Sequence, residues 1–319
     1  MSQKPDLAAL FGAVEVSTFL GLDACSDFER IEASAAYIGA PCATPYLSAG
    51  PYAKNGPDSI RKAAAPLAAN SDRYNFDIGG PLFPEGSLRA VDCGNLPWHE
   101  TDFASNRETI RKTVSTVVGR GTIPILIGGD DSVPIPMLDA LNGTGNKYTV
   151  LQVDAHIDWR DEYLGEKLGL SSNMRRASEM DHIENIIQVG ARGMGSAYPQ
   201  DVEDCLSWGV HLIPASSILQ SGVQQALDHI TENANVVICI DIDGLDPSIT
   251  PNTIGRTPGG LSYQHAIDLI QGVADMAKIA AANFVEIYPE ADIDGQGGLT
   301  VSRLVAATMG IVARQQMAR

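Results

Sequence analysis

The chain carries at residues 148–158 the sequence YTVLQVDAHID, an apolar run that leads directly into acidic and imidazole side chains. A short, nearly continuous apolar run rich in β-branched residues predicts a strand buried on both faces of a parallel sheet. Comparable runs recur along the chain, and segments with helical spacing separate them, which is typical of an α/β fold. The further predicted strands cover residues 36–38, 123–127, 186–189, 236–240 and 284–289, and the predicted helices cover 108–118, 133–141, 223–233 and 302–316.

Carboxylates follow several of these strands at the point where each strand ends. Asp130 and Asp131 follow the strand at 123–127, Asp241 and Asp243 close the strand at 236–240, and Glu286 lies in the last strand. Ligands bind at the C-terminal strand ends of a parallel α/β sheet, so we expect these side chains to meet in one crevice. Alternate residues of an extended segment face the same way, which predicts that Asp154, His156 and Asp158 point together.

So many carboxylates around one imidazole would repel one another in an apolar setting unless cations were bound. The candidate ligands offer oxygen and nitrogen but no sulfur, which favours Mn²⁺, or Ni²⁺, over structural zinc. The alternative is that each aspartate merely caps the turn or helix that follows it.

The net charge of the chain is −17, from 22 basic and 39 acidic residues. Phosphate backbones require basic surfaces, so this charge argues against nucleic-acid partners and favours a small cationic substrate. Residues 1–14 lack the basic and apolar segments of a signal peptide, and no apolar run reaches the ~18 residues of a membrane span. We therefore expect a cytoplasmic protein without a membrane partner. Its five cysteines form no Cys-x-x-Cys pair and are expected to be reduced core thiols.

The motifs at the strand ends resemble those of the ureohydrolase family, which includes arginases and agmatinases. The family's Gly-Gly-Asp-His-Ser motif is similar to residues 128–132, its Asp-Ala-His-x-Asp motif matches 154–158, and its Asp-x-Asp-x-x-Asp-Pro motif matches 241–247. The resemblance extends from about residue 38 to the last helix. It implies an arginase-like, three-layer α/β/α fold with a mainly parallel sheet. We expect a single ureohydrolase domain over residues 1–319, with 1–33 as an N-terminal extension.

The same resemblance implies a centre of two divalent metal ions and a guanidinium substrate. By carry-over, Asp154 and Asp241 would bridge the two ions, and His156 and Asp243 would complete one site. Asp158 would bind at the other site. Glu286 would accept hydrogen bonds from the substrate, so His156 and Glu286 are the expected catalytic residues.

Two positions depart from the family pattern. Asp131 stands where the family has a metal-binding histidine, so one site would contain Asp131, Asp154, Asp158 and Asp241 without an imidazole. The alternative is that Asp131 faces away and Asp130 alone has a structural role. Leu170 and Ser171 stand where most relatives have a His-Gly pair whose histidine moves protons. Ser171 or Ser172 could position a water there, or the proton shuttle is lost.

Two functions are consistent with this pattern. The first is a metal-dependent amidinohydrolase that cleaves the C–N bond of a guanidino or biguanide compound: an agmatinase-like, guanidino acid or metformin-like substrate. Arginine is disfavoured because Ala191-Arg192-Gly193 lacks the acid that arginases carry there. The second is a catalytically degenerate subunit that supports an active paralogue in a hetero-oligomer, since the family commonly forms trimers or hexamers.

Several further residues could contact a substrate or could equally serve the fold. The loop 41–57 either borders the pocket or is an ordinary surface loop. Tyr46, Tyr52 and Trp98 could wall a substrate or only pack. The arginines could hold a substrate carboxylate or pair with local acids; they are Arg175, Arg176 and Arg192.

Overall fold

The computed structural model describes residues 16–318, which form a nine-stranded parallel sheet between two layers of helices. The strand order is β1-β5-β2-β6-β11-β10-β7-β8-β9. The strands are β1 (Asp23–Ala24), β2 (Ala35–Ala40), β5 (Val91–Asn95), β6 (Ile123–Gly128), β7 (Tyr148–Val153), β8 (Ile183–Val189), β9 (His211–Ile213), β10 (Asn235–Asp241) and β11 (Lys278–Val285). A separate antiparallel pair joins β3 (Tyr74–Asn75) to β4 (Gly80–Pro81).

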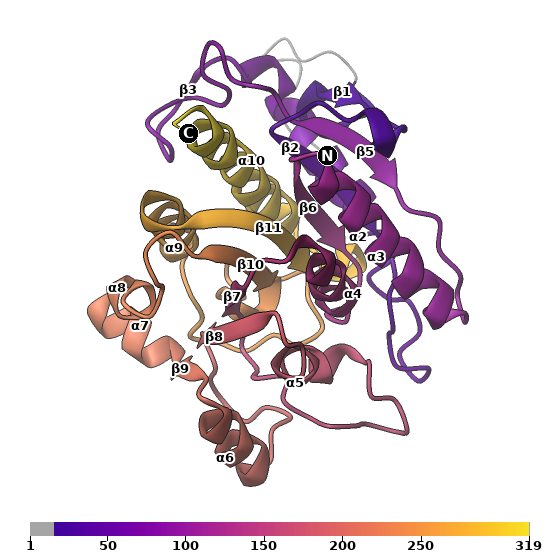
Figure 1. Ribbon diagram of the computed structural model, residues 1–319, viewed down its shortest axis with the longest axis vertical. Coiled ribbons are helices and arrows are strands. Elements are labelled where there is room, and N and C mark those ends of the chain that lie inside the picture. The colour runs from indigo at the N-terminus through magenta and orange to yellow at the C-terminus, as the bar shows by residue number, and fades with distance from the viewer. Residues whose placement is uncertain (1–15, 319) are drawn as a thin grey trace, which may run out of the picture.

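Helices cover both faces of the sheet, and Figure 1 shows α9 and α10 on one side and α3, α4 and α5 on the other. The α-helices are α2 (Gly56–Ala64), α3 (Phe103–Gly119), α4 (Pro134–Ala140), α5 (Asn173–Ser178), α6 (Pro199–Trp208), α7 (Ala215–Ser221), α8 (Gln224–Leu227), α9 (Tyr263–Met276) and α10 (Gln296–Met317). The predicted three-layer α/β/α arrangement with a parallel sheet is therefore confirmed.

The core lies in two apolar layers because alternate strand residues point to opposite faces of the sheet. In β6, Ile125 and Ile127 pack with α2, α9 and α10, whereas Leu126 packs with α3 and α4. Burial on both faces explains why the central strands are almost entirely apolar, as the sequence indicated.

The helices predicted at 108–118 and 302–316 lie within the longer α3 and α10, and two other predicted elements overlap the observed ones only in part. The sequence predicts the last strand at 284–289, but β11 is Lys278–Val285, and its Ala281 and Ala282 pair with β10, with Ala282 also pairing with β6. Alanine has a low β-propensity, and tertiary pairing overrides it here. The helix predicted over 223–233 is limited to Gln224–Leu227, and Asn233 adopts a left-handed conformation.

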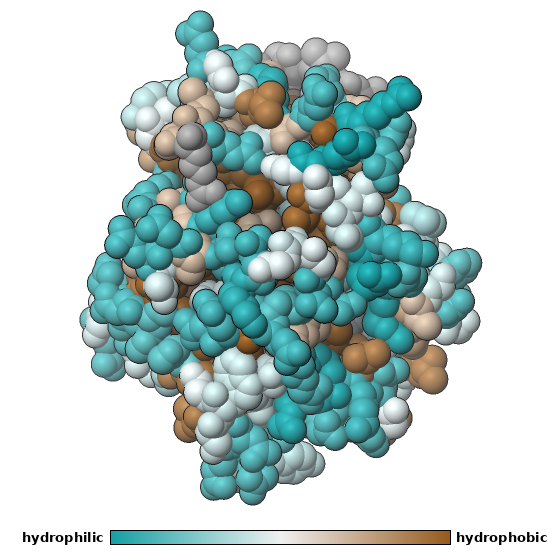
Figure 2. Space-filling view, in the orientation of Figure 1, coloured by the Kyte–Doolittle hydropathy of each residue, from teal (hydrophilic) through white to brown (hydrophobic). Residues whose placement is uncertain are grey.

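Hydrophilic residues cover most of the face in Figure 2. No helix in residues 16–318 is long and apolar enough to cross a membrane. All five cysteines are free; Cys42, Cys205 and Cys239 are buried. The prediction of core thiols is wrong for Cys25 and Cys93, which are half-buried; Cys25 follows the edge strand β1, and Cys93 lies in the neighbouring strand β5.

Candidate metal centre

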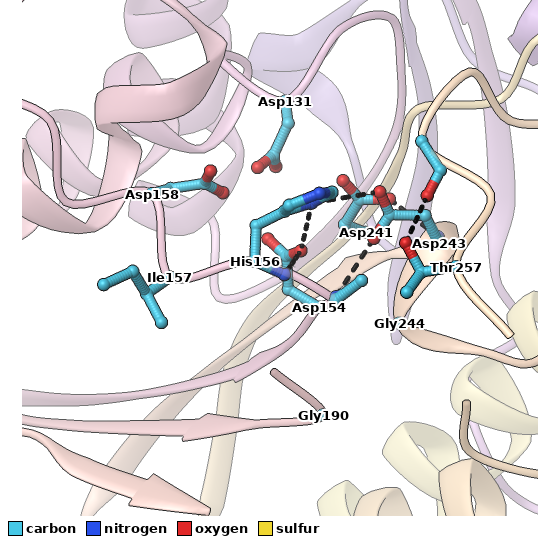
Figure 3. Close-up of polar contacts among 12 residues, drawn as sticks. Asp131, Asp154, His156, Ile157, Asp158, Gly190, Asp241, Asp243, Gly244 and Thr257 are labelled. Carbon is cyan, nitrogen blue, oxygen red and sulfur yellow. Dashed lines mark hydrogen bonds and ion pairs between the residues drawn. The ribbon is translucent and has the colours of Figure 1, made fainter. Parts of the chain in front are cut away.

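Acidic side chains from four adjacent central strands meet at one end of the sheet. Asp131 follows β6, Asp154 follows β7, Asp241 ends β10 and Glu286 follows β11. Asp131, Asp241 and Glu286 line a cavity of about 390 Å³, and all four carboxylates are buried. Figure 3 shows the labelled carboxylates gathered around His156. The predicted convergence at the carboxyl ends of the strands is confirmed.

Three side chains form what we call the imidazole group: Asp154, His156 and Asp243. Their candidate ligand atoms all lie within 4.8 Å of one another. The His156 Nδ1 atom is 3.3 Å from Asp154 Oδ1 and 3.2 Å from Asp243 Oδ2. Asp243 is held in place because its Oδ1 accepts a hydrogen bond of 3.0 Å from the backbone of Ala155. The geometry suits one cation bound by nitrogen and oxygen.

A second set, which we call the oxygen-only group, consists of Asp131, Asp154 and Asp241, again with ligand atoms within 4.8 Å. The two groups share Asp154. Asp131 therefore faces the centre, and the alternative that it faces away is wrong. Its neighbour Asp130 has the structural role, because it accepts hydrogen bonds from the backbone of Ala43 at 3.1 Å and of Ser132 at 3.2 Å.

Asp158 lies beside the oxygen-only group but belongs to neither set. Its Oδ2 is 3.3 Å from Gln152 Nε2 and 3.3 Å from Asn173 Nδ2, and Figure 3 shows its carboxylate turned toward Asp131. The argument from strand alternation does not hold for Asp158, because β7 ends at Val153 and the chain is no longer extended at this residue. Its role as a metal ligand remains a prediction.

The caps considered as an alternative also exist. Asp154 accepts a hydrogen bond from the backbone of His156 at 2.6 Å, and Asp241 accepts one from Asp243 at 2.7 Å. Each carboxylate has two oxygens and about four acceptor positions, so one carboxylate can fix a turn and still bind a cation. The backbone hydrogen bonds therefore position the carboxylates of Asp154 and Asp241 and do not exclude them as metal ligands.

Two carboxylates that line the pocket stand on strained backbone. Asp158 has φ of 43° and Glu286 has φ of 63°, a left-handed conformation uncommon for residues other than glycine. Such residues cost of order 1–3 kcal/mol each and persist where the surrounding structure fixes them. Gly255 provides space rather than a turn: a Cβ there would lie 2.4 Å from Asp243 Oδ2. The local backbone is thus shaped around the carboxylates.

The electrostatics of the centre favour bound cations. Burial, followed by repulsion from neighbouring carboxylates, raises the pKa of Asp131, Asp154 and Asp241 well above the ordinary value. Burial lowers the pKa of His156, but hydrogen bonds to Asp154 and Asp243 outweigh it and raise the pKa to about 12. In the metal-free protein, protons therefore neutralise charges that divalent ions would neutralise instead. The donor set fits two hard or intermediate cations.

Glu286 is fixed by two hydrogen bonds to the same oxygen. Its Oε1 accepts from the Tyr52 hydroxyl at 2.5 Å and from the backbone of Asp131 at 2.9 Å, which leaves Oε2 for the pocket that Glu286 lines. Burial raises the pKa of Glu286 to about 8, while the bond from Tyr52 lowers it. Tyr52 therefore positions the carboxylate of Glu286, which is expected to bind the substrate, and does more than pack.

The pocket wall is formed partly by Tyr46, Leu170 and Ser171. The Tyr46 hydroxyl and the Ser171 hydroxyl are hydrogen bonded, and the ring of Tyr46 packs edge-on against Tyr163 at 4.8 Å between centroids. The loop 41–57 thus borders the pocket through Tyr46. Trp98 is not among the residues that line this pocket, and its ring lies 6.0 Å from Lys54 Nζ.

The three arginines considered for substrate binding have partners within the protein. Arg175 pairs with Glu179 at 3.4 Å, and Arg176 pairs with Asp161 at 2.8 Å. Arg192 donates hydrogen bonds to backbone carbonyls, including those of Asp243 at 2.7 Å and Thr257 at 2.6 Å. Arg192 therefore braces the loop that carries Asp243.

Chelation should make the stability of the protein fall as pH rises. The raised folded-state pKa values of Asp131, Asp154 and Asp241 mean that the folded metal-free protein binds more protons than the unfolded chain above about pH 4. The raised pKa of His156 acts in the same direction above about pH 6.5. We expect Tm in EDTA to be lower at pH 8 than at pH 5.5, and Mn²⁺ to restore more stability at pH 8. Scanning calorimetry measures both. A Tm in EDTA that rises from pH 5.5 to pH 8 would contradict the raised pKa values of these carboxylates. Asp241→Asn should make Tm depend less on pH.

Comparison with known proteins places this geometry in a family. Residues 33–310 match the model of the arginase family. The mitochondrial agmatinase of Gallus gallus is 28% identical over 297 residues, covering 92% of this chain and 84% of that protein. The guanidinobutyrase of Pseudomonas aeruginosa is 26% identical over 280 residues, covering 85% and 84%. The structure of proclavaminate amidino hydrolase from Streptomyces clavuligerus superposes with a TM-score of 0.80 at 22% identity, covering 95% of this chain and 99% of that one. The chain therefore belongs to the arginase family of amidinohydrolases.

Proposed function

We propose that the chain is a binuclear, Mn²⁺- or Ni²⁺-dependent amidinohydrolase that cleaves the C–N bond of a guanidino or biguanide compound other than arginine. The observation that carries the proposal is the pair of ligand groups that share Asp154 beside a pocket lined by Glu286. Relatives named agmatinase and guanidinobutyrase support this substrate class.

The residues of this chain have separable roles in such a reaction. Two divalent ions at the centre would supply an activated water and electrostatic stabilisation at the guanidinium carbon. Glu286 accepts hydrogen bonds from the planar guanidinium and orients it, since a charged acceptor facing a planar cation gives a strong, directional interaction. Tyr52 keeps Glu286 in one orientation from behind. Tyr46 and Ser171 present hydroxyl groups to the same space and can hold a water near the leaving nitrogen.

Arg160 affects which group the substrate can carry at the end away from the guanidinium. It lines the pocket, its Nε and Nη2 atoms donate to the carbonyl of Ser196 at 3.0 and 2.7 Å, and its guanidinium lies 4.7 Å from the centroid of Tyr163. A fixed positive charge in the wall disfavours a substrate with a second cationic end, such as agmatine. It favours a carboxylate tail, as in guanidino acids, or a neutral one.

A direct test uses the purified chain loaded with Mn²⁺ or Ni²⁺ and a panel of agmatine, guanidino acids and biguanides. We expect release of urea or amine from at least one compound, with guanidino acids or biguanides preferred over agmatine. Arginine should remain intact. If both metals are bound and no compound is hydrolysed, the isolated chain is not the enzyme.

The second candidate, a subunit that supports an active paralogue in a trimeric or hexameric hetero-oligomer, is favoured by a specific feature of the pocket. His156 is the only histidine among the described residues that line it. Leu170 and Ser171 form the part of the wall where the family pattern has a histidine. The isolated chain would then bind metal weakly and gain function only in a complex. Light scattering of the chain alone and with a paralogous ureohydrolase, together with activity of each mixture, distinguishes the two functions.

Asp131→His restores the residue type of the family pattern and should raise the affinity of the oxygen-only group for Ni²⁺ by about 10-fold or more, because imidazole is the better ligand for that ion. Titration calorimetry with Ni²⁺ measures the change. The matched control is Asp139→His on the exposed surface of α4, which should leave Ni²⁺ affinity unchanged. Unchanged affinity in Asp131→His would show that Asp131 is not a ligand. Increased affinity without activity in the isolated chain would favour the subunit function.

A further inference from the structure

Three buried amide side chains lie directly behind the carboxylates of the centre. Gln152 belongs to β7, Gln188 to β8, and Asn173 is the first residue of α5. Their exposed fractions are 1%, 1% and 0%. Burying a primary amide is costly unless its donors and acceptor are used, so their placement among charged groups needs a reason.

The hydrogen bonds give this chain of amides one direction. Gln188 Nε2 donates to the carbonyl of Ile157 at 2.7 Å and to Gln152 Oε1 at 2.5 Å. Because Gln152 Oε1 is the acceptor in that bond, its Nε2 must face the opposite way. It donates to Asp154 Oδ2 at 2.7 Å and Asp158 Oδ2 at 3.3 Å. The amides therefore deliver donors, and not acceptors, to the carboxylates.

Asn173 completes the arrangement from the helix side. Its Nδ2 carries two N–H groups, which are shared among the backbone carbonyl of Asp131 at 2.7 Å, the carboxylate of the same residue, and Asp158 Oδ2 at 3.3 Å. One amide nitrogen thus holds together two carboxylates that repel each other. In both carboxylates the oxygen that the amide contacts is Oδ2.

An uncharged donor suits this purpose. A lysine or arginine in the same place would neutralise the carboxylates and compete with a metal ion, whereas an amide orients them and leaves their charge for the cation. Groups that hydrogen bond to metal ligands commonly change metal affinity by about 10–100-fold. The oxygen-only group depends on such orientation more than the imidazole group does, because it is composed only of carboxylates.

We propose that Asn173, Gln152 and Gln188 are positioning residues of the metal centre, which bring Asp158 beside Asp131 and set the affinity of the oxygen-only group for its ion. The proposal rests on the proposed binuclear centre. It places Asp158 at the metal, although Asp158 belongs to neither ligand group. It also predicts that removing the Asn173 amide weakens the binding of one ion and not of the other.

The test is Mn²⁺ binding to the full-length, metal-free protein. Titration calorimetry measures the affinities, and electron paramagnetic resonance detects the bound ions. Asn173→Leu should weaken one of the two Mn²⁺ sites by about 10–100-fold and leave the other within about threefold. Gln152→Met should weaken both sites, because Gln152 also contacts the shared Asp154. The magnetic coupling between paired Mn²⁺ ions should be lost in Asn173→Leu at concentrations where the wild type shows it.

Asn283→Leu is the matched control. Asn283 is also a fully buried amide, on β11, but its Nδ2 lies against Cys239 Sγ at 3.1 Å and Met137 Sδ at 3.8 Å and not against a carboxylate. It should lower Tm while both Mn²⁺ affinities stay unchanged. Should Asn173→Leu not fold, Asn173→Ser and Gln188→Met provide smaller changes in the same network.

Two failures can be told apart. A wild-type chain that binds fewer than two Mn²⁺ or Ni²⁺ ions overturns the proposed binuclear function and this inference with it. A wild type that binds two ions, with Asn173→Leu equal to wild type or weakened equally at both sites, overturns the positioning role alone.

Discussion

Asp154→Asn should lose both metal ions and should lower kcat by at least about 1,000-fold, because the centre would supply several kcal/mol of transition-state stabilisation. Asp154 is the one residue common to the imidazole group and the oxygen-only group. An asparagine keeps the size of the side chain and one oxygen, so the fold is preserved while the bridging charge is removed. Removal of one charge thus affects two sites at once.

The measurement pairs metal analysis of the purified variant with the release of urea or amine from the best substrate of the panel. Asp275→Asn is the control, since Asp275 is exposed on α9 and accepts a hydrogen bond only from Gln271 among the described residues. It should retain wild-type metal content and rate. Two ions per chain in Asp154→Asn, with activity intact, would show that the centre lies elsewhere.

Glu286→Gln should lower kcat/KM by about 100-fold and leave the metal content unchanged, because a hydrogen bond to a charged group contributes roughly 1.5–3 kcal/mol. A glutamine can still accept through Oε1 the bonds that Tyr52 and the backbone of Asp131 donate. The variant therefore keeps its position and loses only the charge that faces the guanidinium.

Steady-state kinetics and metal analysis of the same preparation test this role. Loss of an ion in Glu286→Gln would make Glu286 a ligand instead of a substrate-binding residue. Tyr52→Phe should have a weaker effect in the same direction, since it removes one of the two bonds to Oε1 and leaves the carboxylate in place.

The sequence predicts the centre well where chemistry follows directly from a buried strand. Asp154 and Asp241 stand at the ends of apolar runs, and parallel strands bring such ends together. It predicts Asp158 for the wrong physical reason, since strand alternation ends at Val153 and a left-handed turn carries the chain onward. The strand β11 is misplaced because its alanines indicate a helix as readily as a strand.

Individual side-chain contacts outside the pattern of strand ends could not be predicted. Tyr52 and Glu286 are 234 positions apart, and no local pattern joins a tyrosine in a loop to a carboxylate after the last strand. Gln152 and Gln188 stand inside apolar strands, where a single amide is easily taken for an exposed position. Only the fold shows that Gln152 donates to Asp154 and that Gln188 donates to Gln152 from behind.

Because both ligand groups contain Asp154, two ions bound there would influence one another. Whatever factor the first ion applied to the affinity of the second, the second would apply to the first, because the coupling free energy belongs to the pair. One ion would order the shared carboxylate for its neighbour and would also repel that neighbour, and the balance would set the cooperativity. At limiting metal the population then divides among empty, singly and doubly loaded chains in proportions that the average metal content does not reveal. Turnover should follow the fraction of doubly loaded chains, and hence rise more steeply than the mean occupancy.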